Sequence, residues 1–254
     1  MLGTVIALFG LGLLVGSFLN VCIYRLPRRE SIAWPASHCT QCKRPLAWYE
    51  NVPVVAWLLL RGRCRTCGAA ISAAYPLVEL VTGLVFAGGV LLYGLTPLLA
   101  VRLLFACSMI VLFMIDLRHR ILPNVITLPG IVAGLACSAF LPPGWRAAVI
   151  GAIAGGGALF LIAEVYYRIR GVEGLGMGDV KMLAMIGAFL GWQLTLVTLM
   201  LASFSGSIIG VSLIASGRRD MQAALPFGTF LAVGAIVAAV YGDVLLTWYI
   251  SLYS

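Results

Sequence analysis

The chain has 254 residues, of which 62% are hydrophobic and only 10% are charged. Soluble globular domains carry roughly 25% charged residues, so this composition excludes a soluble domain and indicates a membrane protein. The formal net charge is +8, but the basic residues cluster beside apolar segments. That distribution argues against nucleic acid as a partner and is typical of membrane topology.

Long apolar segments predict an all-α polytopic membrane protein with about eight transmembrane helices, because about 20 apolar residues cross a bilayer. The first segment is too long for a cleavable signal peptide and lacks basic residues before it, so we expect a retained helix. The predicted spans cover residues 1–24, 76–94, 97–115, 125–142, 147–167, 180–192, 193–215 and 226–248. The sixth is the shortest.

Arginines at the end of the first span predict the orientation. Arg25, Arg28 and Arg29 should face the cytoplasm, since basic residues accumulate on that side. Threading the other spans alternately leaves only Arg102 and Arg146 on the outer side. Both chain ends are then expected outside, and the polar segment of residues 25–75 is expected in the cytoplasm.

This polar segment carries two CxxC pairs, Cys39 with Cys42 and Cys64 with Cys67. Four thiolates in this spacing suit a closed, tetrahedral structural Zn²⁺ site. Two disulfides, a redox-active pair, or His38 as a substitute ligand are the alternatives, and a cytoplasmic location disfavours stable disulfides. We expect Zn²⁺ to hold together a small cytoplasmic domain. The other cysteines are interpreted as small apolar residues within spans: Cys22, Cys107 and Cys137.

Two aspartates fall at predicted cytoplasmic edges of spans, where ionisable groups are costly and usually functional. Asp116 ends the third span; Pro123 then breaks the helix and Asn124 can cap the next one. Asp179 opens the sixth span. Since both lie at the same membrane face in this topology, we expect their carboxyl groups to meet.

Paired carboxyl groups are what aspartyl proteolysis requires. One ionised group deprotonates a water while the other, kept protonated, donates to the scissile carbonyl oxygen. Gly176 and Gly178 precede Asp179, and their missing Cβ atoms would let an extended substrate backbone approach closely. Taken alone, this GxGD pattern equally fits a turn followed by an N-cap aspartate.

The remaining acidic residues have simpler explanations. Glu164 can pair with Arg168 one helical turn later. Glu79 lies near the start of the second span, either as a helix-start acid favoured by the helix dipole or as a residue near the site. The others fall in polar loops or at the outer end of the last span: Glu30, Glu50, Glu173, Asp220 and Asp243.

Several motifs occur together in one order along the chain: Gly16-Ser17-Phe18-Leu19-Asn20-Val21, Tyr24-Arg25-Leu26-Pro27, the two CxxC pairs around Glu50-Asn51-Val52-Pro53, Tyr75-Pro76-Leu77-Val78-Glu79-Leu80, the Asp116 segment, Gly176-Met177-Gly178-Asp179-Val180-Lys181 and Leu225-Pro226-Phe227-Gly228. In this combination the sequence resembles the type IV prepilin peptidases, which are GxGD membrane aspartyl proteases. The resemblance implies that Asp116 and Asp179 are the catalytic pair.

The resemblance also implies a substrate and a location. The substrate is a prepilin or pseudopilin, cleaved after a glycine at the cytoplasmic face of the bacterial inner membrane. The arginine-rich loops would repel its basic leader, so net charge does not explain leader recognition. Many relatives carry an acid where Asn124 stands, and some have a longer segment before the first CxxC pair.

Many family members also methylate the new N-terminal amine with S-adenosylmethionine, and the resemblance implies this second activity. The sequence assigns no residue to it. The loop with Trp48, Glu50, Asn51 and Trp57 is one location for the cofactor, and a structural role fits these residues equally well.

We therefore expect a first transmembrane helix at 1–24, a tetracysteine domain at 25–75 and a protease core at 76–254. One rival is another GxGD intramembrane protease, which the zinc loop and the Leu122-Pro123-Asn124 sequence disfavour. A second rival is a zinc-containing transporter, which would more naturally place acids near the bilayer midplane within an inverted repeat. The sequence does not identify the particular pilin or the oligomeric state.

Overall fold

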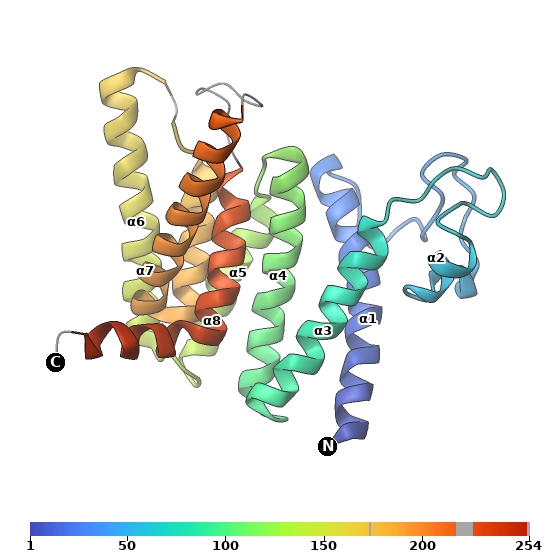
Figure 1. The fold of residues 1–254 in the computed structure, drawn as a ribbon, viewed down its shortest axis with the longest axis horizontal. Helices are drawn as coiled ribbons and strands as arrows, with labels where there is room; N and C mark the ends of the chain where they lie inside the picture. Colours follow the sequence, from blue (N-terminus) through green and yellow to red (C-terminus); the bar gives the residue numbers. More distant parts are fainter. Residues whose placement is uncertain (173, 217–225, 253–254) are drawn as a thin grey trace. The chain divides into compact units, whose positions relative to one another are not determined.

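The computed structural model describes residues 1–172, 174–216 and 226–252, so Glu173, Asp220 and Leu225 lie outside the described residues. The regular structure of the described part is helical (Figure 1). The expected all-α class is thereby confirmed. The helices are α1 (Leu2–Arg25), η1 (Leu26–Arg28), η2 (Trp48–Asn51), α2 (Val55–Leu59), α3 (Ala74–Tyr93), α4 (Pro97–His119), α5 (Asn124–Ser138), α6 (Trp145–Arg170), α7 (Met177–Ala215) and α8 (Phe227–Ser251).

The predicted spans agree with the observed helices. Six helices of the described chain are long and apolar enough to cross a membrane: α1, α3, α4, α6, α7 and α8. Helix α5 is apolar but shorter, with 15 residues. Helix α7 has 39 residues and covers two predicted spans, because the non-helical backbone of Gly191 (φ 78°, ψ 169°) divides it. Eight apolar helical segments therefore correspond to the eight predicted spans.

Gly191 reverses the direction of the chain. The positive φ at this position is one that glycine adopts without a steric penalty. On α6, a Cβ at Gly155 would meet both Leu183, before the break, and Thr195, after it. Since both segments of α7 reach the same turn of α6, they run side by side in opposite directions.

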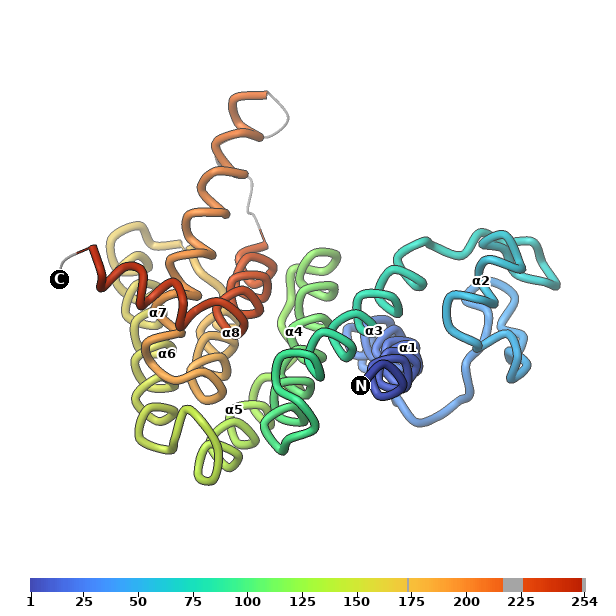
Figure 2. Tube along the Cα trace, turned by 60° about the horizontal axis from the view of Figure 1, so that its bottom comes forward, coloured from blue at the N-terminus to red at the C-terminus, as the bar shows by residue number. Residues whose placement is uncertain are grey.

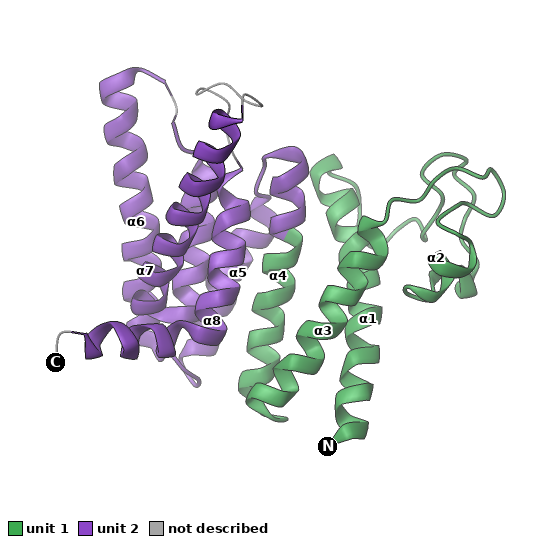
Figure 3. Ribbon diagram, viewed as in Figure 1, with its two compact units in different colours: residues 1–111 green, residues 112–254 purple. Residues whose placement is uncertain are grey.

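The chain forms two compact units, Met1–Val111 and Leu112–Ser254 (Figure 3). In the first unit, α1 and α3 approach closely, because a Cβ on Gly16 would lie 2.7 Å from the Cα of Glu79. Burial of apolar side chains does not drive association between helices in lipid. Close packing of backbones at small residues contributes to it instead. The amide of Asn20 adds a hydrogen bond to the carbonyl of Tyr75, at 3.0 Å.

The second unit is built around α7, which packs against α5, α6 and α8 (Figure 2). Its first segment supplies the centre of this packing, with four fully buried large side chains: Met182, Leu183, Met185 and Ile186. Glycines bring the neighbouring helices close, and a Cβ on Gly187 would collide with the carbonyl group of Gly151 on α6.

This contact predicts a position-specific effect of a single methyl group. Gly187→Ala should destabilise the protein by about 2 kcal/mol, because backbone atoms of α6 cannot move aside as a flexible side chain could. Gly157→Ala is the matched control, since nothing lies within 4 Å of its Cβ position. Thermal unfolding in one detergent should show a lower midpoint for Gly187→Ala alone. Equal midpoints would contradict this packing.

Candidate functional site

Three helix ends of the second unit converge on one place: the carboxyl end of α4 and the amino ends of α7 and α8 (Figure 1). Leu122, in the loop after α4, fills the space between them. A Cβ on Gly178 would lie 2.9 Å from the Cβ of Leu122, and a Cβ on Gly228 would lie 2.9 Å from its Cδ1. Both glycines therefore allow the segments to meet. The predicted approach of substrate at Gly176 and Gly178 stays a prediction.

Asp116 is held at this junction by the amino end of α8. Its side chain is buried, and its Oδ2 accepts two hydrogen bonds from Thr229, one from the backbone N–H at 2.7 Å and one from Oγ1 at 3.0 Å. Thr229 is the third residue of α8, where backbone N–H groups have no partner within the helix. A Cβ on Gly228 would lie 3.0 Å from the same oxygen, so the absence of a side chain at this position leaves room for the carboxylate.

Asp179 lies in the first turn of α7, as its third residue. Its carboxylate interacts with the backbone N–H of Gly176, the residue that precedes the helix, and with the charge of Asp116. The Oδ1 atom of Asp179 is buried and has no hydrogen-bond partner in the described structure. The structure thus brings the two predicted aspartates together and leaves one buried carboxylate oxygen available for a ligand.

Asn124 does not have the capping role that the sequence indicated. Pro123 precedes α5 in an extended conformation (ψ 127°), and the Oδ1 atom of Asn124 instead accepts a hydrogen bond from Lys181, at 3.0 Å. Lys181, the fifth residue of α7, lies beside this amide, so the amide oxygen binds a cation instead of capping α5. This bond links the start of α5 to the segment that carries Asp179.

Sequence reasoning missed Thr229. The available signal was a polar residue three positions after Pro226, because helices often begin after proline and their first N–H groups need acceptors. The sequence could not reveal that the acceptor is a carboxylate from a distant helix. The pair of Glu164 and Arg168 is as predicted, with an Nε–Oε1 distance of 2.7 Å.

The four predicted cysteines form a cluster in the first unit that could hold a metal ion. The Sγ atoms of Cys39, Cys42, Cys64 and Cys67 all lie within 4.8 Å of one another. None of these cysteines is in a disulfide. His38 is not part of the cluster, and its Nδ1 lies 3.0 Å from the carbonyl oxygen of Ala36. The arrangement fits a tetrahedral thiolate site with no open position.

Each CxxC pair lies in a knuckle with the same backbone bonding. In the first, the N–H of Cys39 donates to the carbonyl of Arg44 (2.9 Å), and the N–H of Lys43 donates to that of Cys39 (3.0 Å). In the second, Cys64 and Gly68 take the places of Cys39 and Lys43. Lys43 and Gly68 both have a positive φ, 58° and 69°. The turns therefore converge on the same shape despite different sequences.

Backbone groups prepare the sulfur atoms for a cation. Hydrogen bonds from the backbone N–H groups of Cys67 and Thr66 lower the pKa of Cys64 to about 6. The sulfur of Cys67 accepts a hydrogen bond from the backbone of Ala69, yet burial and the neighbouring thiols raise the pKa of Cys67 to about 11. Thiolates this close repel each other, so a divalent cation would replace the remaining protons.

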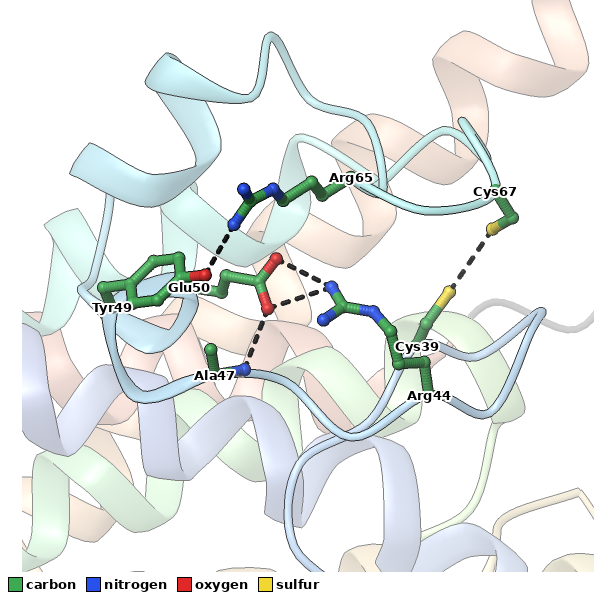
Figure 4. Close-up of polar contacts among 7 residues, drawn as sticks. All are labelled: Cys39, Arg44, Ala47, Tyr49, Glu50, Arg65 and Cys67. Atoms are coloured by element: carbon green, nitrogen blue, oxygen red, sulfur yellow. Dashed lines mark hydrogen bonds and ion pairs between the residues drawn. The ribbon is translucent and has the colours of Figure 1, made fainter.

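A partly buried ion pair lies beside the cluster (Figure 4). The Nη2 of Arg44 lies 2.7 Å from Oε1 and 2.9 Å from Oε2 of Glu50, whose side chain is only 3% exposed. The Arg44 guanidinium and the backbone N–H of Ala47 hold the pKa of Glu50 below its ordinary value. Arg44 also interacts with Cys64 of the other knuckle. Glu50 therefore has a structural role.

Glu79 connects the polar segment to α1 and α3 through hydrogen bonds. It is buried in α3 and accepts a hydrogen bond from the backbone N–H of Val54 at 2.8 Å and another from Ser17 of α1. The expectation of a helix-start acid is wrong, because Glu79 is the sixth residue of α3 and lies beyond its first turn. Its partners on α1 and in the loop decide its position instead.

The cluster predicts that metal content depends on individual cysteines. Cys64→Ser should lose most of the bound metal, since the site needs all four sulfur ligands and has no spare donor. Cys107→Ser is the control, because Cys107 lies in α4 and outside the cluster. Elemental analysis of purified protein checks this. Equal metal content in both variants would contradict the site.

Comparisons with known proteins give consistent matches. The model of the bacterial peptidase A24 N-terminal domain matches residues 11–93, and that of the type IV leader peptidase family matches residues 103–211. A prepilin leader peptidase/N-methyltransferase of Myxococcus xanthus (strain DK1622) is 45% identical over 215 residues, covering 83% of this chain but only 64% of the relative. The chain thus spans less than two thirds of that relative's length.

Other relatives match over almost their whole length. A prepilin leader peptidase/N-methyltransferase of Aeromonas salmonicida (strain A449) is 38% identical over 274 residues, covering 96% of this chain and 92% of the relative. The protein of that name from Pseudomonas putida is 38% identical over 260 residues, covering 92% of this chain and 89% of the relative. No solved structure matches the chain.

Proposed function

The chain belongs to the type IV leader peptidase family, and from this we propose that it is an aspartyl endopeptidase of the bacterial inner membrane that removes the leader of a prepilin or pseudopilin. The observation that carries the proposal is the meeting of Asp116 and Asp179 at three helix ends. A pair of carboxyl groups in a partly buried site is the arrangement that aspartyl proteolysis needs.

The two aspartates take different roles in the proposed reaction. Asp116 is the base, because Oδ2 accepts two hydrogen bonds from Thr229 and lies at the amino end of α8, where the helix dipole favours an anion. Asp179 is the acid, because its buried Oδ1 has no partner in the described structure and is free to carry a proton toward substrate.

In this scheme Asp116 removes a proton from water as the water oxygen attacks the carbonyl carbon of the scissile bond. Asp179 gives its proton to the carbonyl oxygen, which forms a neutral diol. The C–N bond then breaks, and Asp116 returns its proton to the departing amine while Asp179 regains one from the diol. Each group ends as it began.

The location of the pair suits a substrate at the cytoplasmic membrane face. Arginines gather at the carboxyl ends of α4 and α6: Arg118, Arg120 and Arg168. The positive-inside rule expects such residues at the cytoplasmic ends of membrane helices. A prepilin has its leader in the cytoplasm and its apolar helix in the bilayer, so the bond after its leader glycine reaches the helix ends.

We also infer a second activity and a metal. The relatives are named N-methyltransferases, so this chain should transfer a methyl group from the sulfonium of S-adenosylmethionine to the new N-terminal amine, with release of a proton. The four thiolates fit Zn²⁺ in a structural role. Proteolysis is assigned to residues 76–254 and the metal to 25–75, after a first membrane helix at 1–24.

Removing either carboxylate tests the protease. Asp116→Asn and Asp179→Asn should each lower cleavage of a prepilin peptide by at least about 10³-fold, since neither amide can exchange a proton as the scheme requires. Asp243→Asn is the matched control, because Asp243 is an exposed residue of α8. Product formation is measured by mass spectrometry in detergent or lipid. Full activity in either active-site variant would overturn the assignment.

The same assay separates methylation from proteolysis. With S-adenosylmethionine present, the mature product should gain the mass of one methyl group. A peptide supplied without its leader should be methylated by Asp116→Asn as well, because transfer to a free amine does not need the carboxylate pair.

Thr229 is expected to act through Asp116. Thr229→Val keeps the side-chain shape but removes the hydroxyl donor, and should lower kcat by roughly 10-fold to 100-fold with little change in KM. Thr229→Ser, which retains the hydroxyl, should recover most of the activity. Thr198→Val is the control, since that buried hydroxyl bonds the carbonyl of Leu194 within its own helix. A loss in Thr229→Ser equal to that in Thr229→Val would argue for a packing role only.

A further inference from the structure

Helix α2 exposes an apolar face within the polar segment. Val55, Leu58 and Leu59 are 51%, 61% and 78% exposed and fall at positions i, i+3 and i+4, so they share one side of the helix. On the other side, Ala56 is buried and Trp57 is half-buried. Exposed apolar clusters outside membrane spans mark contact surfaces.

Hydrogen bonds on the opposite side of α2 fix the orientation of this apolar face. The Nε1 of Trp57 donates to the carbonyl of Ile71 at 3.0 Å. The N–H of Gly62 donates to the carbonyl of Trp57 at 2.8 Å, and the N–H of Ile71 donates to that of Gly62 at 2.7 Å. These bonds join the inner side of α2 to the second cysteine knuckle, so the apolar face is held outward.

The start of α2 lies beside a membrane-spanning helix. The residue before it, Val54, donates its N–H to Glu79, which is the sixth residue of α3 and therefore about 8 Å from the start of that helix. Figure 1 shows α2 to the side of the pair formed by α1 and α3. Helices that lie in the membrane interface bury their apolar face by about 5–10 Å. The distance of Glu79 from the start of α3 falls within this range.

The charges beside this face suit an anionic surface. Arg61 and Arg63 are exposed and follow α2 directly. Between Trp48 and Arg65 the one acidic residue is Glu50, and its carboxylate is already bonded to Arg44. Arginines next to an apolar face bind the phosphate groups of anionic lipids in the cytoplasmic leaflet.

We propose that the α2 surface, defined as Val55, Leu58, Leu59, Arg61 and Arg63, docks on the bilayer in which the chain is embedded. The apolar side chains enter the boundary between headgroups and acyl chains, and the guanidinium groups contact anionic headgroups. The arginines of this segment then bind lipid headgroups. Their positive charge is neutralised there and does not repel the basic leader of a prepilin.

Hydrogen exchange on the full-length protein in nanodiscs tests the docking. Amides of residues 55–63 should exchange roughly tenfold more slowly in discs containing phosphatidylglycerol than in phosphatidylcholine discs, as docking adds protection to local opening. Arg61→Gln with Arg63→Gln should remove this lipid dependence. Leu58→Gln with Leu59→Gln should remove the protection in both lipids. Ile32→Gln with Arg29→Gln, exposed residues of the same segment outside the cysteine knuckles, should change neither.

Metal content, measured alongside, shows whether each variant keeps its cysteine knuckles. If a variant loses metal, its exchange rates are set aside. The exchange rates of the unmodified protein in the two kinds of nanodisc then test the proposal. Exchange that is the same in both discs overturns the proposal. Protection that arises only after a prepilin peptide is added overturns it too, and would identify the surface as a protein-binding one.

Discussion

The hydrogen bonds from Thr229 to Asp116 are the constraint on which the arrangement of the second unit depends. An acid at the end of a membrane helix is costly unless its oxygen atoms find donors. The amino end of α8 supplies two of them, and Gly228 leaves the room that this approach needs. Since α8 also packs on α7, fixing Asp116 places it beside the helix that carries Asp179.

The same principle governs the first unit, where buried polar groups bond across the chain instead of facing lipid. Glu79 joins α3 to α1 and to Val54. Arg44 of the first cysteine knuckle pairs with Glu50 and interacts with Cys64 of the second knuckle. A segment as short as residues 25–75 forms only a small core, which is marginal for folding alone. The metal site and these bonded carboxylates provide the order that a core would otherwise provide.

The sequence anticipated the helices well because lipid imposes one rule on every span. Backbone groups must bond within the helix, so apolar length alone predicts the segment. The break near residue 192 also agreed with Gly191, as glycine tolerates a positive φ. The errors fell on polar side chains near helix ends, Asn124 and Glu79, where partners from distant segments compete with the local capping that sequence patterns indicate.

The sequence by itself determined the membrane class, the order of the spans and the four cysteines, since composition and CxxC spacing are local properties. It also singled out Asp116 and Asp179. Only the tertiary structure decided that Thr229 holds Asp116, that Leu122 fills the space against Gly178, and that α2 turns an apolar face outward. These features depend on which helix ends meet, and that depends on packing between residues far apart in the chain.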